Sequence, residues 1–303
     1  MVTRIATFAL NDRMLAASLR TQAKMGEVQV QEASGSVSAD YGGLGGSAKT
    51  LVSLEVSLAR SKAYASAADE AGNRVDVMYD ALNSMTDMLS SFRASLSGAI
   101  SSSATDASDT SLISTAQSYL TEFASLLNTQ FEGRYLFAGS DTTQPAVDLT
   151  TYAATDVDTA DTSYYQGNAT TTSVRVSSER TVNYGVTGDN TAFEQALRAL
   201  SAVANAATTP DSDTLQAISD LVVSAVDAVA AVQGRLSVNA ATLERASATQ
   251  TDYQDFTSGL ISNVRDVDIT AVAAQLSSYE TQLQASYAAL AKIQSLNLLD
   301  YLK

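Results

Sequence analysis

"VDVMYDALNSMTDMLSSFRASLSGA", residues 75–99, carries a regular heptad repeat. The apolar positions alternate three and four residues apart, and they are Val75, Met78, Leu82, Met85, Leu89, Phe92, Leu96 and Ala99. This spacing places them all on one side of an α-helix, where they form a seam that packs against another helix. The stretch therefore predicts a long helix with at least one helical partner.

The same repeat recurs further along the chain. A polar break at residues 101–111 precedes a second seam at Leu112, Ala116, Tyr119, Phe123, Leu126 and Gln130. A longer seam comprises Leu215, Ile218, Val222, Ala225, Val229, Val232, Leu236, Asn239, Leu243, Ala246, Gln250, Tyr253, Thr257, Leu260 and Val264. At 1.5 Å per residue, this last seam predicts a helix about 75 Å long. Its polar positions either fix the register of a helix pair or mark a locally hydrated seam.

Both ends of the chain also carry apolar stripes. The C-terminal stripe is Ile269, Val272, Leu276, Tyr279, Leu283, Leu290 and Ile293, and the N-terminal one is Ile5, Phe8, Leu15 and Leu19. Chain ends usually fray unless something holds them, and each buried Leu or Ile contributes about 1.5–3 kcal/mol. We therefore expect the two ends to pack on each other or on copies of the chain, and these eleven residues to form an assembly interface.

Two stretches interrupt the helical pattern. Residues 26–50 are rich in Gly and Ser and without a period, which predicts a loop or a weakly ordered connector. In residues 145–190, Val174 and Val176 alternate with polar residues, as do Val182, Tyr184 and Val186. This alternation predicts a β element of two to four strands, too small to fold without the flanking helices.

The predicted fold is mainly α with a small β insert, in which N- and C-terminal segments build a long antiparallel, coiled-coil-like helical rod. We assign residues 1–140 to the N-terminal half of the rod, 141–192 to a surface β insert and 193–303 to the C-terminal half. Residues 1–48 and 265–303 are the expected assembly region.

Composition excludes several classes of function. The 303 residues include no Cys and no His, which removes thiol nucleophiles, disulfides, imidazole bases and common metal ligands. We expect no catalytic residue, cofactor, metal or small-molecule substrate, and hence no enzyme. The net charge of −15 disfavours nucleic acid and anionic membranes as partners. No run approaches the ~18 apolar residues of a membrane span, and "MVTRIATFALNDRML" at the start lacks the apolar run of a secretory signal.

Two motifs have both a chemical and a structural interpretation. In "FEGRYLFAGSDTTQP", residues 131–145, the two glycines superficially suggest a phosphate loop, but Leu136 and Phe137 fill the space that a phosphate needs. We interpret the motif as a turn with Tyr135 and Phe137 packed beneath it, whose Arg134 pairs with an acid on a neighbour or is solvated. Asp266 and Asp268 stand just before an apolar helix and are interpreted as N-terminal caps rather than metal ligands.

The sequence resembles the bacterial flagellin family and, most of all, the hook–filament junction proteins (hook-associated protein 3). The resemblance is carried by the apolar termini, by "YETQLQASYAALAKIQSLNLLDYL" at 279–302 and by "NTQFEGRYLFAGSDTTQPAV" at 128–147. In that central motif the matching residues are Asn128, Gly133, Arg134, Tyr135, Leu136, Phe137 and Gly139. The loop "SGSVSADYGGLGGSAKT" departs from the family in being much richer in Gly.

The resemblance implies a structural part of the bacterial flagellum that joins hook to filament by subunit–subunit helix packing, with filament flagellin as the alternative. The central motif would be the hinge between rod and insert. The implied partners are copies of the chain, flagellin, other hook-associated proteins and an export chaperone at the C-terminal helix. The implied location is extracellular, after type III export without a cleaved signal peptide. A secreted hydrolase and a coiled-coil signalling rod are alternatives from other classes, but residues 145–190 offer no base with an orienting partner.

Overall fold

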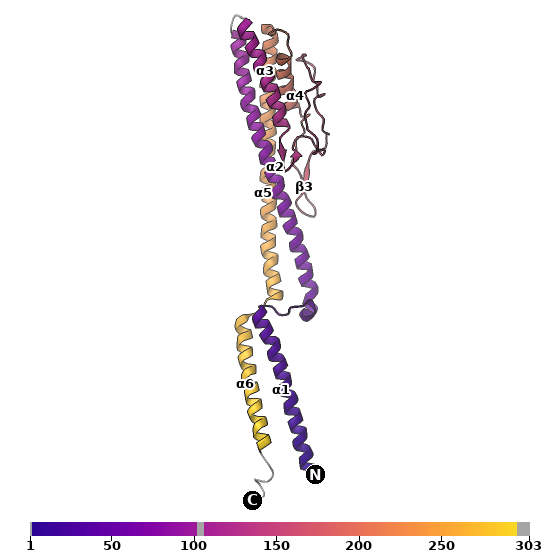
Figure 1. Cartoon of the computed structure of the whole chain (residues 1–303), viewed down its shortest axis with the longest axis vertical. Coiled ribbons are helices and arrows are strands. Elements are labelled where there is room, and N and C mark those ends of the chain that lie inside the picture. Colours follow the sequence, from indigo (N-terminus) through magenta and orange to yellow (C-terminus); the bar gives the residue numbers. More distant parts are fainter. Residues whose placement is uncertain (1, 102–105, 296–303) are drawn as a thin grey trace. The chain divides into compact units, whose positions relative to one another are not determined.

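The computed structural model describes residues 2–101 and 106–295, with the side chains of residues 9, 11–101 and 111–293. In chain order the elements are α1 (Val2–Ser34), the 3₁₀ helix η1 (Tyr41–Ser47), α2 (Ala48–Ser101), α3 (Asp106–Leu127), β1 (Gln130–Phe131), β2 (Arg134–Tyr135), β3 (Ser173–Arg175), β4 (Thr181–Asn183), α4 (Thr191–Ala204), α5 (Ser212–Arg265) and α6 (Ile269–Ser295). In the described part of the chain, two small hairpins follow one another between α3 and α4, with the other helices before and after them (Figure 1). The predicted class, mainly α with a small β insert, is confirmed.

The chain forms two compact units. Unit 1 comprises Met1–Arg60 and Tyr253–Lys303, and unit 2 comprises Ser61–Asp252. The two longest helices, α2 and α5, have 54 residues each, and each contributes residues to both units.

The core of unit 2 is built on the heptad seams of α2 and α5. Seven of the eight predicted α2 positions, from Val75 to Leu96, are buried, as are the α5 positions from Leu215 to Leu236. The helices are antiparallel, since Gln233 Nε2 donates to Asn83 Oδ1 at 2.8 Å and Ser61 Oγ to Gln250 Oε1 at 2.9 Å. The heptad spacing therefore identified both helices that organise this unit, and the structure shows that they pair.

The polar seam residue Gln250 joins three elements. Its Oε1 accepts a hydrogen bond from the hydroxyl of Ser61 on α2, and its Nε2 donates to the carbonyl of Val176 beside β3 at 3.1 Å. Because these bonds form only in one alignment, the geometry supports the interpretation that this position fixes the register.

Helices α3 and α4 pack against each other and complete the core of unit 2. Three phenylalanines connect this layer to the motif, because Phe193 makes edge-on contacts with Phe123 at 6.5 Å and Phe137 at 5.6 Å between ring centroids. The predicted α3 seam was partly wrong. Leu120 and Leu127 are buried, whereas the predicted Tyr119 and Leu126 are half-buried and Gln130 is exposed in β1. A helix that contacts more than one neighbour buries a wider face than a two-helix seam does.

The β structure is sparse. Strands β3 and β4 pair antiparallel with Val174 opposite Val182, and Val147 and Tyr165 form an isolated bridge. The expected strands of the insert are thus confirmed at two. The hairpin β1–β2, with Phe131 opposite Arg134, was not predicted.

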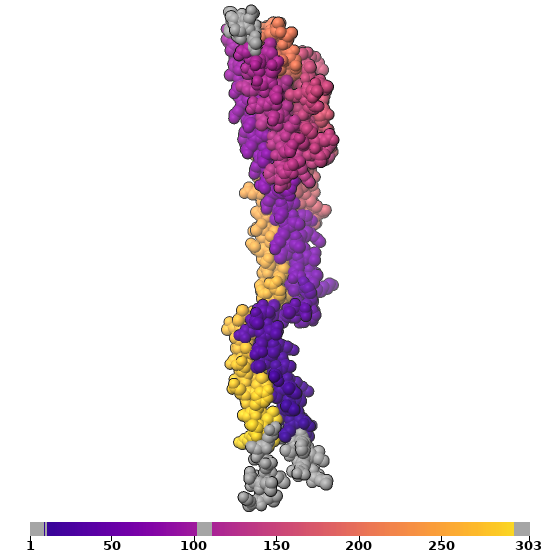
Figure 2. Space-filling view, in the orientation of Figure 1, coloured from indigo at the N-terminus to yellow at the C-terminus, as the bar shows by residue number. Residues whose placement is uncertain are grey.

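Unit 1 contains the paired helices α1 and α6, which lie side by side in Figures 1 and 2. The prediction that residues 26–50 form a loop was wrong for most of that stretch. Helix α1 continues to Ser34, with Val28 buried, and η1 and the start of α2 follow, so that the connector is residues 35–40. Gly35 and Gly45 have φ values of 68° and 54°, which suit glycine at the bends.

By length and composition alone, α5 could cross a membrane: it includes an 18-residue window of mean hydropathy 1.7, of which 39% is buried. This corrects the expectation that no run approaches a membrane span. The apolar residues of α5 recur at heptad spacing and face the core of unit 2, as in a core helix.

Candidate assembly surface and motif corner

Exposed large apolar side chains are concentrated in unit 1. Among the side chains that the structure describes, eleven of the twelve lie there, namely Leu15, Leu19, Val30, Val37, Tyr41, Val52, Val56, Tyr253, Phe256, Ile269 and Tyr287. Of the side chains described in unit 2, only Val238 is a large exposed apolar one, although this unit contains the continuous core of buried residues 68–246. Exposed apolar surface of this kind marks a site of association.

The net charge of the chain is distributed very unevenly between the two units. Unit 1 has nine basic and ten acidic residues, a net charge of −1, whereas unit 2 has nine basic and twenty-three acidic residues, a net charge of −14. Nearly all of the chain's net charge of −15 is therefore on unit 2. Close packing of copies through unit 1 would meet little electrostatic repulsion.

The predicted interface residues of α6 have two kinds of environment. Val272 and Leu283 are buried, each 6% exposed, whereas Ile269 is 57% exposed. Leu276, Tyr279, Leu290 and Ile293 are half-buried. The packing of α1 against α6 within one molecule thus accounts for part of this stripe and leaves its flank uncovered.

On α1, Leu15 and Leu19 point outward, with exposed fractions of 51% and 57%. The predicted side chains of Ile5 and Phe8 lie outside the described residues. Residue Ser18, between the two leucines, is buried instead. The assignment of Leu15 and Leu19 to contacts between subunits stays a prediction, and their exposure is compatible with it.

Sequence reasoning missed two exposed pairs in unit 1. Val52 and Val56 are one turn apart on α2, and Tyr253 and Phe256 are one turn apart on α5. Tyr253 was assigned to a buried seam but is 45% exposed, and Phe256 is 65% exposed. The sequence did offer one signal of an exposed aromatic residue, because Phe256 lies one position before the heptad residue Thr257.

The two connectors of unit 1 pair with each other. Ser36 and Asp266 form an isolated bridge, Val37 N donates to Arg265 O at 2.7 Å, and Val267 N donates to Gly35 O at 3.0 Å. The Asp268 carboxylate accepts from the backbone N–H groups of Thr270 and Ala271, as expected of a helix cap.

Asp266 holds the end of α5 rather than capping α6. Its carboxylate accepts from the hydroxyl of Ser262 and, at 3.0 Å, from Nε of Arg265. These hydrogen bonds, that from Ser262 first, hold the pKa of Asp266 below its usual range. Asp266 was predicted as a second cap, and this part of the interpretation was wrong.

In unit 2 the central motif builds a corner between α3 and the insert. The Asn128 side chain donates to Val147 O and accepts from Val147 N, both at 2.9 Å. Phe137 is fully buried, and its carbonyl accepts from Gly188 N at 2.7 Å. Gly139 has a φ of 72°, and an added Cβ would lie 2.2 Å from the carbonyl oxygen of Asn168. Only glycine suits both the conformation and the space.

The hairpin of the motif lies at the surface. Glu132 and Gly133 have φ values of 52° and 75°, as a tight turn requires. Arg134 is exposed and forms no ion pair with the residues that the structure describes, so its pairing with an acid on a neighbour or its solvation stays a prediction. Tyr135 is half-buried and Leu136 is buried.

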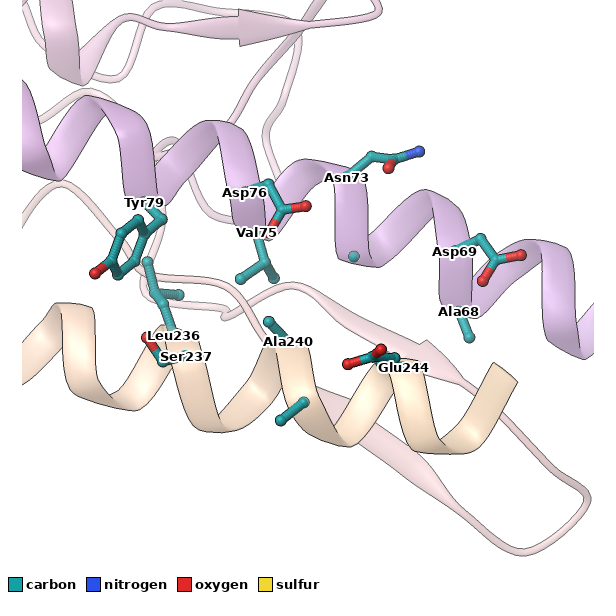
Figure 3. A pocket seen from close by; sticks show the side chains of 12 residues that line it. Ala68, Asp69, Asn73, Val75, Asp76, Tyr79, Leu236, Ser237, Ala240 and Glu244 are labelled. Atoms are coloured by element: carbon teal, nitrogen blue, oxygen red, sulfur yellow. The ribbon is translucent and has the colours of Figure 1, made fainter. Parts of the chain in front are cut away.

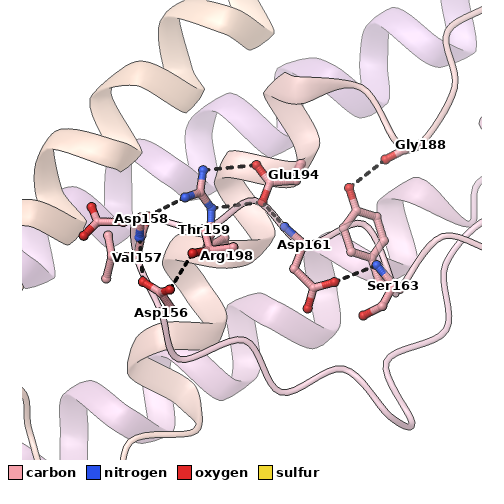
Figure 4. A network of polar contacts seen from close by, with 10 residues as sticks. Asp156, Val157, Asp158, Thr159, Asp161, Ser163, Gly188, Glu194 and Arg198 are labelled. Carbon is pink, nitrogen blue, oxygen red and sulfur yellow. Dashed lines mark hydrogen bonds and ion pairs between the residues drawn. The ribbon is translucent and has the colours of Figure 1, made fainter.

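A buried ion pair braces the insert against α4 (Figure 4). Arg198 Nε lies 2.9 Å from Glu194 Oε1, and the two residues are only 7% and 3% exposed. Glu194 also accepts from the backbone N–H of Asp161 at 2.9 Å, and Arg198 donates to the carbonyl of Val157. Both charges thus have partners in the loop that they hold, as buried charges require.

No group of three metal-ligating side chains occurs among the described residues. The strongly shifted groups are buried tyrosines. Burial is the main cause that raises the pKa of Tyr152, Tyr164 and Tyr165. The second cause is the charge of Asp161 for Tyr152, the neighbouring Tyr152 for Tyr164 and the charge of Asp189 for Tyr165, whose pKa is raised to about 12. These phenols stay protonated at neutral pH, where they serve packing rather than proton transfer.

Comparison with known proteins identifies the C-terminal part of the chain. Residues 219–302 match the family model of the bacterial flagellin C-terminal helical region. The chain has a flagellin-like fold. No curated protein matches it at a significant level.

Three solved structures that share this fold are described as flagellar proteins. A putative hook-associated protein from Vibrio parahaemolyticus is 20% identical with a TM-score of 0.58, and the match covers 75% of this chain and 99% of that one. FlgL from Bacillus cereus is 14% identical with a TM-score of 0.55, covering 69% and 99%. Hook-associated protein 3 from Legionella pneumophila is 14% identical with a TM-score of 0.54, covering 70% and 98%.

The flagellin-type match begins within α5 and extends beyond the described part of α6. It therefore includes the exposed Tyr253 and Phe256, the paired connector at Asp266 and the stripe that runs from Ile269. The flagellin-like fold places most of the exposed apolar side chains in unit 1, which is made from both ends of the chain.

Proposed function

We propose that this chain is a non-enzymatic structural component of the bacterial flagellum that joins hook to filament through helix packing between subunits. The observation that supports this function best is the exposed apolar surface of unit 1 on a fold shared with hook-associated proteins. A chain that forms a solid core in unit 2 yet leaves eleven large apolar side chains uncovered in unit 1 gains stability when copies cover them.

The proposed partners are copies of the chain, flagellin and other hook-associated proteins, and an export chaperone that covers α6 before assembly. The proposed location is extracellular, in the flagellum, after export. Residues 1–48 and 265–303 are the proposed assembly region, and the corner at Asn128–Gly139 is the proposed hinge between the helices and the surface insert at 141–192.

Gene deletion tests the proposal against its alternative. Without a junction protein, cells should form hooks, fail to retain filaments and release unassembled flagellin monomer into the medium. The chain should also be a trace component of purified filaments. If the chain instead dominates purified filaments, or polymerises alone into long filaments, it is a flagellin and the junction role is wrong.

A further inference from the structure

A groove between α2 and α5 of unit 2 has an apolar floor and an acidic rim (Figure 3). Its volume is about 640 Å³. Along it, Val75 of α2 points toward Ala240 of α5, and Ala68 points toward α5 on the side of Glu244 (Figure 3). Gly72 leaves the floor open, since a Cβ added there would meet no atom within 4 Å. A helix with small side chains can approach such a floor closely.

Three exposed carboxylates stand around the groove. They belong to Asp69, Asp76 and Glu244, and none of them forms an ion pair with the residues that the structure describes. Asp69 and Asp76 are seven residues apart, which is two helical turns or about 10.5 Å. Because the groove lies on a unit of net charge −14, it selects a cationic occupant.

Helix α1 has a face with the matching charges. Arg13, Arg20 and Lys24 are all exposed and, at 100° per residue, lie within about 20° of one direction. Arg13 and Arg20 are also seven residues apart, and the small side chains of Ala16 and Ala17 lie exposed between them. This basic face differs from the flank that carries Leu15 and Leu19, so that both surfaces of α1 can be occupied at once.

We propose that the groove of one copy binds the basic face of α1 from a second copy. Arg13 and Arg20 pair with Asp69 and Asp76, the alanines of α1 lie over Gly72 and Ala240, and Lys24 extends toward the acidic rim. The inference rests on the proposed self-association and adds a contact between unit 1 of one copy and unit 2 of another, with charge setting its register.

Disulfide crosslinking tests this contact directly, because the chain has no cysteine of its own. Full-length chains carrying Ala17→Cys and Gly72→Cys are mixed under mild oxidation, and a heterodimer is expected. Ala17→Cys mixed with Ser118→Cys, an exposed position on α3, is the control and should crosslink much more slowly. Equal crosslinking rates for the two pairs would overturn the proposal. The same holds if the groove binds a basic helix of another protein while Ala17→Cys and Gly72→Cys give no heterodimer.

Charge reversal supplies the second measurement. Adding Arg13→Glu and Arg20→Glu to the Ala17→Cys chain should lower the heterodimer yield roughly two- to thirtyfold, the range for two exposed ion pairs. Asp69→Lys and Asp76→Lys in the Gly72→Cys chain should restore it. A chain that joins hook to filament but gives no crosslink would overturn this inference alone, whereas a crosslinked chain that is absent from the flagellum would overturn the proposed function instead.

Discussion

Asn128 and Val147 are joined by two reciprocal hydrogen bonds of 2.9 Å, one donated by the Asn128 amide and one accepted by it. The residue that directly follows α3 thereby imitates a strand partner for the backbone at the start of the insert.

Replacing Asn128 with Ala should lower the free energy of unfolding of unit 2 by about 1–3 kcal/mol, because both backbone groups of Val147 lose their partner. The stability of Asn128→Asp should lie between that of the parent and that of Asn128→Ala, since a carboxylate can accept from Val147 N but cannot donate to Val147 O. Urea denaturation measures the change, with exposed Asn73→Ala as the control. Equal stability of Asn128→Ala and Asn73→Ala would contradict the role of the corner.

Two glycines of the motif provide a matched comparison. Gly139→Ala combines a φ of 72° with a Cβ placed against the Asn168 carbonyl, and it should cost about 2–5 kcal/mol. Gly133→Ala has a φ of 75° but no atom within 4 Å, so that it should cost only about 1–2 kcal/mol. Thermal unfolding of the two variants gives the difference, and the reverse order would refute the assigned crowding at Gly139.

The buried pair of Glu194 and Arg198 should be far more sensitive to removal of one charge than of both. Glu194→Ala leaves the Arg198 guanidinium buried without its carboxylate and should cost about 3–5 kcal/mol. The double variant Glu194→Leu/Arg198→Met leaves no charge unpaired and should be more stable than the single variant in the same urea titration. A double variant as unstable as the single one would argue against this account.

Alkaline pH should weaken unit 2 through its buried tyrosines. Because the pKa values of Tyr152, Tyr164 and Tyr165 are raised in the folded state, their stabilisation is complete below the unfolded value of about 10 and is lost as the pH rises toward 12. The Tyr152 hydroxyl has no hydrogen-bond partner among the described residues. Tyr152→Phe should therefore match the parent within about 1 kcal/mol at pH 7 and lose less stability between pH 10 and 11.5. Urea titrations at both pH values test this, and a parallel decline in both proteins would contradict it.

In unit 1, substitutions of exposed apolar residues should affect assembly, whereas substitutions of buried ones should affect folding. Leu15→Asp with Leu19→Asp should leave the helical circular dichroism unchanged but prevent incorporation into flagella, because both side chains are already in water. Leu283→Asp should lower the melting temperature of the α1–α6 pair, because Leu283 is buried there. Removing residues 269–303 should abolish incorporation, and normal incorporation of any of these variants would count against the proposed assembly region.

The parts of the fold that are encoded by short-range spacing could be predicted from the sequence. The seam from Val75 to Leu96 and that from Leu215 to Leu236 repeat every three or four residues, and the structure buries both. The extension of α1 through residues 26–34 was missed because this segment, which has only one Gly and one Ser, was grouped with the Gly- and Ser-rich residues 35–47. Its packing partner, α6, is also far away in sequence. The hairpin β1–β2 has two residues per strand, too few for an alternation signal.

The candidate surface was only partly predictable for a similar reason. Spacing identified Leu15, Leu19 and Ile269, which are exposed, together with Val272 and Leu283, which are buried within one molecule. A heptad shows which residues share a face but not which neighbour covers that face. Tyr253 and Phe256 show the same limit. Tyr253 is a heptad position and Phe256 is not, yet both side chains are exposed.

The cross-paired connectors of unit 1 have a mechanical consequence. Because Gly35 to Val37 is hydrogen-bonded to Arg265 to Val267, tension along either segment is shared by both. Pulling these segments apart requires breaking the backbone bonds of a bridge rather than straightening a free loop. In a rotating appendage, such a joint would pass torque through two strands of polypeptide at once, and neither strand would stretch alone.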